Sequence, residues 1–235
     1  MSWSVAIPDY QLYSESQIQE IVRSVLSLKK HWVRRQGAGV FTLGMASYQD
    51  GPQLLKDTSR VSASNDLLKS HFSDPLATLL AFLQSCLGAE AHFSDVLPLP
   101  GFHVFDVNAI AVGQTSLRPH FDLQFKVSSF PGAVHEVASV TVPLQLPSGG
   151  ASFEYWPVAY EEFEELLRRG IVSDIGGLER LYPVQQVWYI PGRPCIQRGL
   201  PLHRVGPSRH ATPSDLRVTL QCHAVRLSDG WTAYW

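Results

Sequence analysis

The chain is poor in cysteine, and this bears on its cellular setting. Its three cysteines, Cys86, Cys195 and Cys222, are odd in number and widely spaced. They form no Cys-x-x-Cys pair and indicate no disulfide framework, which favours a reduced, cytoplasmic environment. The first residues lack a basic segment followed by an apolar one, so we expect no signal peptide.

The chain also lacks a strong charge of either sign and a long apolar run. Its formal net charge is −2, so nothing indicates a surface for nucleic acid or anionic membranes. The densest basic group, residues 29–35, closes a predicted helix, where cations complement the helix C-terminus. The apolar stretch at residues 79–87 is too short to cross a bilayer. We therefore expect neither a nucleic-acid partner nor a membrane, and the oligomeric state stays open.

The composition is otherwise that of a globular protein. The chain has 235 residues, of which 45% are hydrophobic and 17% charged. This length suits a single domain, and the sequence contains no internal repeat or low-complexity segment. We expect one domain over residues 1–235, with a mostly helical layer over 1–97 and a strand-rich core over 98–235.

The first part of the chain predicts two helices and a strand. One helix starts at Ser14, because Ser14 and Gln17 form a capping-box pattern before an apolar stripe at helical spacing. A second helix is expected from Asp74-Pro75 to Gly88. Between them we predict a strand at residues 39–44 and an irregular surface loop or substrate lid over the polar segment Asp50–Asn65.

From residue 100 onward, turn formers separate short apolar stretches, which predicts strands. One segment, Pro157–Arg169, has the charge order of a solvated helix. The predicted fold class is therefore α+β and mainly β, a cupin-like double-stranded β-helix (jelly roll) with the N-terminal helices packed on one sheet. The expected strands are Phe102–Val112, Phe121–Ser128, Val137–Leu146, Ser152–Trp156, Val184–Ile190, Cys195–Leu200, Leu216–Val225 and Trp231–Tyr234.

Residues 118–122, Arg-Pro-His-Phe-Asp, contain a His-x-Asp tripeptide. The tripeptide alone is weak, but apolar and polar residues alternate after it as they do in a strand. His120 and Asp122 are then expected on one strand face, where they can take adjacent positions on one metal ion. With a distant histidine they would complete the 2-His-1-carboxylate triad that binds non-haem Fe(II).

His203 has the best setting for the third ligand. It follows a strand, a Pro-Gly turn and a second strand, whereas His210 lies in a polar loop and His223 among apolar strand neighbours. Farther along, Arg217 and Thr219 share one face of a predicted strand. A guanidinium beside a hydroxyl is suited to hold a carboxylate, and the alternative is an ordinary strand arginine in a salt bridge.

Together these residues resemble the Fe(II)/2-oxoglutarate-dependent dioxygenase superfamily, through the triad and a downstream Arg-x-Ser/Thr motif, over about residues 98–224. Segments 41–48 and 99–105 are similar to a branch that acts on free amino acids and includes halogenases and hydroxylases. The resemblance implies that His120, Asp122 and His203 hold Fe(II). It also implies that Arg217, assisted by Thr219, holds the far carboxylate of 2-oxoglutarate. Halogenases replace the triad carboxylate with a small residue, so Asp122 argues against halogenation.

The implied reaction uses O₂ and 2-oxoglutarate, releases succinate and CO₂, and oxidises an unactivated C–H bond. The outcome would be hydroxylation, desaturation or oxidative ring closure such as aziridine formation. The implied substrate is a small molecule, an amino acid or related acid. Arg118 and Arg60 suit its carboxylate, and His103 and Trp156 suit a pocket wall.

Two alternatives to this enzyme stay open. One is a cupin-type metalloenzyme that uses no 2-oxoglutarate, in which Arg217 would have no purpose. The other is a non-catalytic binding module in which His120 and Asp122 only pair with each other.

Overall fold

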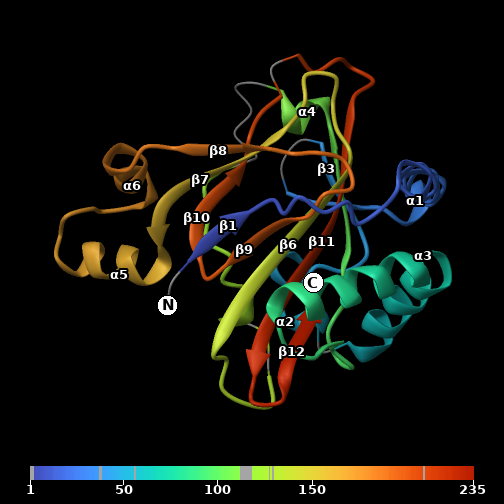
Figure 1. Cartoon of the computed structure of the whole chain (residues 1–235), viewed down its shortest axis with the longest axis horizontal. Coiled ribbons are helices and arrows are strands. Elements are labelled where there is room, and N and C mark those ends of the chain that lie inside the picture. Colours follow the sequence, from blue (N-terminus) through green and yellow to red (C-terminus); the bar gives the residue numbers. More distant parts are fainter. Residues whose placement is uncertain are drawn as a thin grey trace.

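The computed structural model describes residues 3–36, 39–55, 57–111, 118–126, 128, 130–208 and 210–235, which form two β-sheets and a layer of helices (Figure 1). The larger sheet contains β1 (Ser4–Ala6), β2 (Val33–Arg34), β3 (Val40–Leu43), β4 (Ala91–Phe93), β5 (Gly101–Asp106), β6 (Glu136–Gln145), β9 (Cys195–Arg198), β11 (Leu216–Leu227) and β12 (Gly230–Tyr234). The smaller sheet contains β7 (Ser152–Ala159), β8 (Gln185–Trp188) and β10 (Pro201–Val205). The helices are α1 (Glu15–Ser27), α2 (Ser47–Leu55), α3 (Thr58–Leu87), α4 (Val107–Ile110), α5 (Tyr160–Arg168) and α6 (Ile175–Leu181), with 3₁₀ turns η1 (Lys29–His31) and η2 (Gln124–Lys126).

The strand order confirms the predicted jelly roll. The larger sheet runs β1-β9-β6-β11-β5-β3-β2, and β12 joins β11 to β4, while the smaller sheet runs β10-β7-β8. All neighbouring strands are antiparallel except β12 and β4. The N-terminal helices α1 and α3 cover one face of the larger sheet (Figure 1). Within the described residues, no helix combines the length and apolar character needed to cross a membrane.

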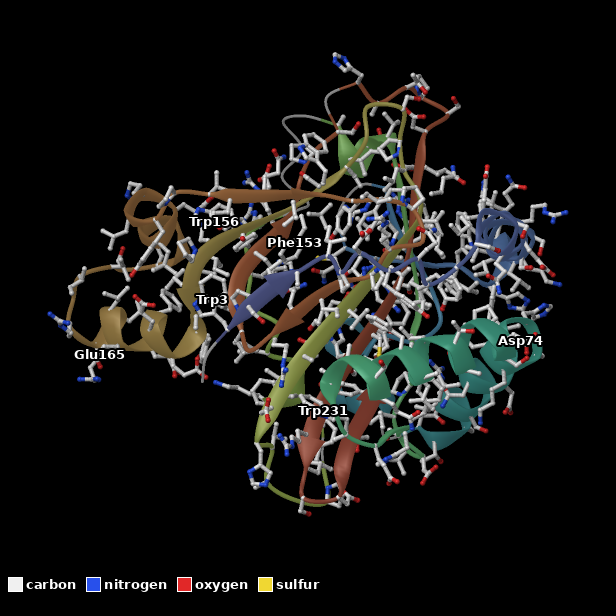
Figure 2. The ribbon with its side chains drawn as sticks, viewed as in Figure 1. Trp3, Asp74, Phe153, Trp156, Glu165 and Trp231 are labelled. Carbon is white, nitrogen blue, oxygen red and sulfur yellow. The ribbon has the colours of Figure 1, made fainter. Side chains whose placement is uncertain are left out.

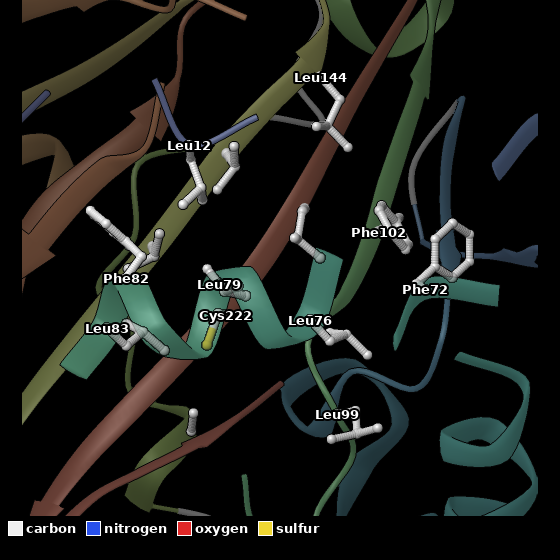
Figure 3. Packing of buried hydrophobic residues seen from close by; sticks show 14 of the residues in the cluster. Leu12, Phe72, Leu76, Leu79, Phe82, Leu83, Leu99, Phe102, Leu144 and Cys222 are labelled. Atoms are coloured by element: carbon white, nitrogen blue, oxygen red, sulfur yellow. The ribbon is translucent and has the colours of Figure 1, made fainter. Parts of the chain in front are cut away.

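Alternation along β11 separates a core from a cavity. Val218, Leu220 and Cys222 are buried on the side that faces the helices. Arg217 and His223, on the other side, line a cavity between the two sheets. Burying one such apolar side chain contributes about 1.5–3 kcal/mol, so this packing fixes β11 firmly beneath the cavity. The helix residues of α3 that pack over the strand include Leu76, Leu79 and Leu83 (Figure 3).

The two predicted helices are present, and one boundary was wrong. Ser14 caps α1 with the predicted capping box, and α3 ends as predicted at Gly88, which has a φ of 68°. However, α3 begins at Thr58, capped by Asp57, and not at Asp74. The backbone is non-helical only at Phe72, just before the proline, so Asp74-Pro75 restarts a kinked helix and does not begin a new one.

The polar segment Asp50–Asn65 is helical where the structure describes it, and the expected irregular loop was wrong. It contains the end of α2 and the first turns of α3, with Gly51 at a positive φ of 73° interrupting α2. Lys56 lies outside the described residues. The segment is polar because much of it faces solvent. Exposed helices and surface loops are both polar, so polarity alone did not distinguish them here.

Two predicted strands differ from the structure. The strand expected at Phe102–Val112 ends at Asp106, because the Asp106 side chain accepts a hydrogen bond from the backbone N–H of Asn108 and caps α4. The strand expected at Phe121–Ser128 is absent from its described residues. There, only the preceding His120 forms an isolated bridge, and η2 follows. The predictions for Val112 and Val127 lie outside the described residues.

The helix expected at Pro157–Arg169 starts later than predicted. Strand β7 continues through Pro157 to Ala159, and α5 begins at Tyr160. A proline is tolerated in a strand where its missing N–H is not needed for pairing, so it did not mark the helix start here.

Candidate metal centre

His120, Asp122 and His203 lie together, with ligand atoms all within 4.8 Å of one another. Oδ1 of Asp122 lies 3.8 Å from Nε2 of His120 and 3.7 Å from Nε2 of His203. The side chain of His203 is 7% exposed, whereas that of His120 is 54% exposed. The group is therefore anchored on one side and open on the other, as a catalytic metal site requires.

Backbone pairing brings the two histidines together. His120 and His203 form an antiparallel bridge in which each N–H donates to the other's carbonyl, at 2.8 and 3.0 Å. Their rings are 4.5 Å apart. Because β10 carries His203 and the bridge fixes His120 beside it, two ligands 83 positions apart in the sequence become neighbours (203 − 120 = 83).

Both histidines have the tautomer that metal binding needs. Nδ1 of His120 lies 2.9 Å from the carbonyl of Arg118, and Nδ1 of His203 lies 3.0 Å from that of Pro201. A carbonyl only accepts, so each Nδ1 carries the proton and each Nε2 presents a lone pair toward Asp122. Burial lowers the pKa of His203 to about 4, although Asp122 opposes the shift, and His203 is therefore neutral near pH 7.

The second carboxylate oxygen of Asp122 is held from behind. Oδ2 accepts a hydrogen bond of 2.7 Å from the hydroxyl of Ser139 on β6. The same hydroxyl oxygen lies 2.9 Å from Nδ1 of His223, which is also 2.6 Å from the amide of Gln124. Burial alone would raise the pKa of Asp122. However, His203, His223 and His120, together with the Ser139 hydroxyl, hold it below its ordinary value. Asp122 is therefore an oriented carboxylate.

Arg217 is a buried cation that lines the same cavity, whose volume is about 440 Å³. Arg217 is completely buried, and its three guanidinium nitrogens make no hydrogen bond of normal geometry to the described residues; the nearby Tyr189 hydroxyl only helps to favour the charged form. The guanidinium carbon lies 4.8 Å from the ring centre of Tyr189 and 5.5 Å from that of Phe105. A buried charge without a partner is strongly unfavourable, so this geometry calls for an anion in the cavity. The alternative of a strand salt bridge does not apply, since no described ion pair includes Arg217.

Of the other predicted site residues, some line the cavity and some do not. Thr219 is buried beside Arg217 on β11, but its hydroxyl accepts a hydrogen bond from Gln221 and it does not line the cavity. His103 lines the cavity, as does Arg118, whose residue is largely exposed. His223 also lines the cavity, where it contacts Asp122 from behind.

Arg60 and Trp156 do not line the cavity, so the expected contact with a substrate there is not supported by their positions. Arg60 is an exposed residue of α3 that pairs with Asp57 at 3.2 Å. Trp156 is buried in a separate cluster with residues of α5 and α6. Figure 2 shows Trp156 on β7 beside α6, whereas Phe153 of the same strand lies nearer the middle of the molecule. Phe153 lines the cavity and stacks on His203, with ring centres 5.1 Å apart.

Sequence reasoning missed several residues of the site. Tyr48, Ser139 and Tyr189 contact predicted site residues, and Gln124 contacts His223 behind them. Only Ser139 carried a usable signal. It lies on the predicted strand Val137–Leu146, on the face opposite the apolar residues Ala138, Val140 and Val142. A hydroxyl at that place suggests an inward-facing polar contact.

No family model and no curated protein matches the chain. Solved structures do match. SnoK, an alpha-ketoglutarate-dependent carbocyclase from nogalamycin biosynthesis, has a TM-score of 0.52 and 10% identity, covering 99% of this chain and 92% of that one. SnoN, an epimerase from the same biosynthesis, has a TM-score of 0.50 and 15% identity, covering 95% and 80%. HygX from Streptomyces hygroscopicus, solved with nickel and 2-oxoglutarate, has a TM-score of 0.50 and 12% identity, covering 94% and 81%.

The chain shares their fold. The match extends over nearly its whole length, so the helical layer and both sheets belong to the shared architecture. The resemblance drawn from the motifs is thereby confirmed at the level of the fold.

The buried histidines predict that the metal-free protein loses stability in mild acid. Burial lowers the pKa of His103 to about 3 and that of His203 to about 4, from an ordinary value of 6.5. Below about pH 6.5 the unfolded chain takes up these protons and the folded chain does not. The free energy of unfolding therefore decreases as the pH is lowered. Between about pH 6.5 and 4, each histidine costs about 1.4 kcal/mol per pH unit. Urea unfolding at several pH values measures this, and His103→Gln should flatten the slope. An unchanged free energy of unfolding down to about pH 4 would contradict the burial of these groups as neutral imidazoles.

Proposed function

We propose that the chain is a non-haem Fe(II)- and 2-oxoglutarate-dependent oxygenase that oxidises an unactivated C–H bond of a small molecule. One observation carries the proposal. A three-ligand group with an open side and a buried, unpartnered guanidinium line the same cavity. The first suits Fe(II), and the second suits the far carboxylate of a dicarboxylic co-substrate.

The residues present fit both groups. Two imidazoles and one carboxylate are the ligand set typical of non-haem Fe(II) oxygenases, and His120, Asp122 and His203 supply it with ligand atoms that all lie within 4.8 Å of one another. Arg217 would hold the far carboxylate of 2-oxoglutarate. When bound, Fe(II) and 2-oxoglutarate supply, with O₂, the oxidation of a C–H bond and release succinate and CO₂.

The chain itself contributes orientation and a dry environment. Ser139 fixes the rotation of the Asp122 carboxylate, so the other oxygen stays directed at the two histidines. Phe153, Tyr189 and Phe105 give the cavity aromatic walls that limit the water around Arg217. In such a setting the interaction between Arg217 and a carboxylate is stronger than in water.

The substrate we propose is an amino acid or a related small acid. Arg118 supports this. Like Arg217 it lines the described cavity, and it is exposed, so an incoming carboxylate can reach it. Hydroxylation, desaturation and ring closure such as aziridine formation all begin with removal of one substrate hydrogen, and the placement of the substrate selects among them.

An anaerobic titration tests this function. We expect 2-oxoglutarate, added to the Fe(II)-loaded protein, to produce a visible metal-to-ligand charge-transfer band. O₂ should then yield succinate, and a screen of free amino acids and small acids by mass spectrometry should reveal a product changed by +16 or −2 mass units. Metal binding without the band would favour the cupin-type alternative. A protein that binds no metal would favour the non-catalytic module.

A further inference from the structure

One part of the cavity wall contains no candidate metal ligand and lies next to Arg217, across the paired strands β5 and β11. It carries Tyr48 and His103, and the cavity is also lined by the polar residues Gln36, Gln49 and Gln221. The hydroxyl of Tyr48 lies 2.7 Å from Nε2 of His103, and the two rings meet edge to face. Tyr48 is 40% exposed, so a ligand can reach the pair from the open side of the cavity. Its ring also lies 6.0 Å from that of His223, which places the pair next to the Asp122 network.

The pair is held rigidly. Arg35 binds both carboxylate oxygens of Asp50, and both side chains of this ion pair are less than 10% exposed. Asp50 also accepts a 2.7 Å hydrogen bond from the backbone N–H of Ala46, just before α2. Arg35 further donates to the hydroxyl of Thr42 on β3. The start of α2, which carries Tyr48, is therefore fixed to the sheet before any ligand arrives, so little ordering cost falls on binding.

The pair is also neutral. Burial, with Arg217 adding to it, lowers the pKa of His103 to about 3, so the imidazole is uncharged near pH 7. Although Tyr48 is 40% exposed as a whole residue, desolvation at the cavity wall, with Asp122 adding to it, raises the pKa of its hydroxyl, so that group keeps its proton. In either His103 tautomer, the Tyr48 hydroxyl has one remaining hydrogen-bonding capacity, as a donor or as an acceptor. It offers a ligand a directed hydrogen bond without a charge.

The cavity has no anion left for a positively charged ligand. Asp122 is the one acidic residue that lines it among the described residues, and the metal would occupy this carboxylate. Asp50 is already paired with Arg35. The segments outside the described residues contain no aspartate or glutamate in the sequence. A buried ammonium group without a counter-ion would cost several kcal/mol, which is enough to decide which molecules bind.

We propose that Tyr48 and His103 form the substrate-recognition site, and that they bind a neutral oxygen group, a hydroxyl or carbonyl, of a substrate with no free ammonium group. This inference rests on the proposed function and narrows it. Among amino acids and related acids, it selects those whose amino group is absent or acylated. In this role Tyr48 and His103 determine which substrate binds, and they do not take part in metal binding.

Calorimetric titration of the protein loaded with Zn(II), a redox-inactive substitute, and 2-oxoglutarate tests the proposal without turnover. The probes are matched pairs, namely the N-acetyl and free forms of the same amino acids. We expect N-acetyl members to bind, and to bind at least about tenfold more tightly than their free partners, because one well-placed hydrogen bond and one avoided buried charge each reach that size. Equal or tighter binding of the free forms, or no binding by any N-acetyl form, overturns the proposal.

A conservative variant locates the effect. Tyr48→Phe removes only the hydroxyl and should weaken binding of the N-acetyl probes about tenfold, while the affinity for 2-oxoglutarate stays unchanged. Tyr10→Phe, at an exposed tyrosine that stacks on Phe82 and does not line the cavity, is the matched control and should change neither affinity. Probe binding that survives Tyr48→Phe unaltered removes the pair from recognition. Failure of 2-oxoglutarate itself to bind would instead count against the proposed function.

Discussion

We expect Asp122→Ala to abolish iron-dependent oxidation by this protein. Asp122 supplies the only carboxylate among the described cavity residues, and its Oδ1 faces the ligand nitrogens of both His120 and His203. The variant loses a ligand atom and the negative charge that offsets the metal. Since changes behind a ligand already lower metal affinity about 10- to 100-fold, loss of the ligand itself should lower Fe(II) affinity by more than about 100-fold. Anaerobic Fe(II) titration and succinate assays measure the two losses.

Two further variants make this result specific. Ser139→Ala keeps the ligand and removes only the hydrogen bond to Oδ2, so Fe(II) affinity should fall by an intermediate amount, about tenfold. Asp66→Ala, at an exposed residue of α3, should have no effect on either measurement. If Asp122→Ala still formed succinate coupled to product, the carboxylate would not be a required ligand.

Arg217→Ala should weaken 2-oxoglutarate binding more than any other single change outside the triad. Truncating one partner of a buried charge pair costs about 2–5 kcal/mol, which corresponds to about 30-fold or more in affinity. Arg217→Lys should recover part of the loss, because it restores the charge without the two-pronged geometry. The Fe(II)–2-oxoglutarate charge-transfer band, titrated under anaerobic conditions, reports the affinity directly.

The stability of the Arg217 variants separates binding from folding. In the protein without ligands, the guanidinium is buried among aromatic rings with no described hydrogen-bond partner. Arg217→Met fills similar space without that charge, so its free energy of unfolding should equal or exceed that of the unaltered chain. Arg226→Ala, on the same strand but exposed and paired with Glu136, is the control and should leave 2-oxoglutarate binding unchanged. An unchanged affinity in Arg217→Ala would remove Arg217 from the site.

The parts of this molecule that depend on regular periodicity could be predicted from the sequence. Ser14 and Gln17 mark the start of α1 by a local hydrogen-bonding pattern, and the structure contains it. The alternation in β11 places Arg217 on the face opposite Val218, because successive strand residues point to opposite sides. The three triad residues could be grouped because a non-haem Fe(II) site requires two histidines and one carboxylate close together, wherever they lie in the sequence.

Prediction failed where a pattern had another physical cause. Phe121, Leu123 and Phe125 alternate with polar residues, yet they lie in no strand. Phe121 packs in the cluster near α5, Phe125 packs in another cluster, and Leu123 touches both, so the alternation reflects two separate packing surfaces. The same pattern nevertheless grouped His120 with Asp122, and the two side chains do lie together because the bridge to His203 fixes His120.

Long-range contacts explain the residues that were missed. Tyr48 reaches His103 only because Arg35 and Asp50, 15 positions apart, pair beneath the start of α2. No local pattern in the sequence encodes that contact. The helix around Gly51 could not be predicted either, because polar residues and a glycine are equally typical of a loop.

The three candidate ligands come from different layers of the fold. His203 belongs to the smaller sheet, whose outer face packs its own apolar cluster with α5 and α6, while Asp122 is tied through Ser139 to β6 of the larger sheet. A bound ion would therefore join the two sheets at the cavity, in addition to the apolar cluster of Phe153 and Cys195 that already packs them together. It follows that a change in how the two sheets pack would alter metal affinity even where none of the three ligands is changed.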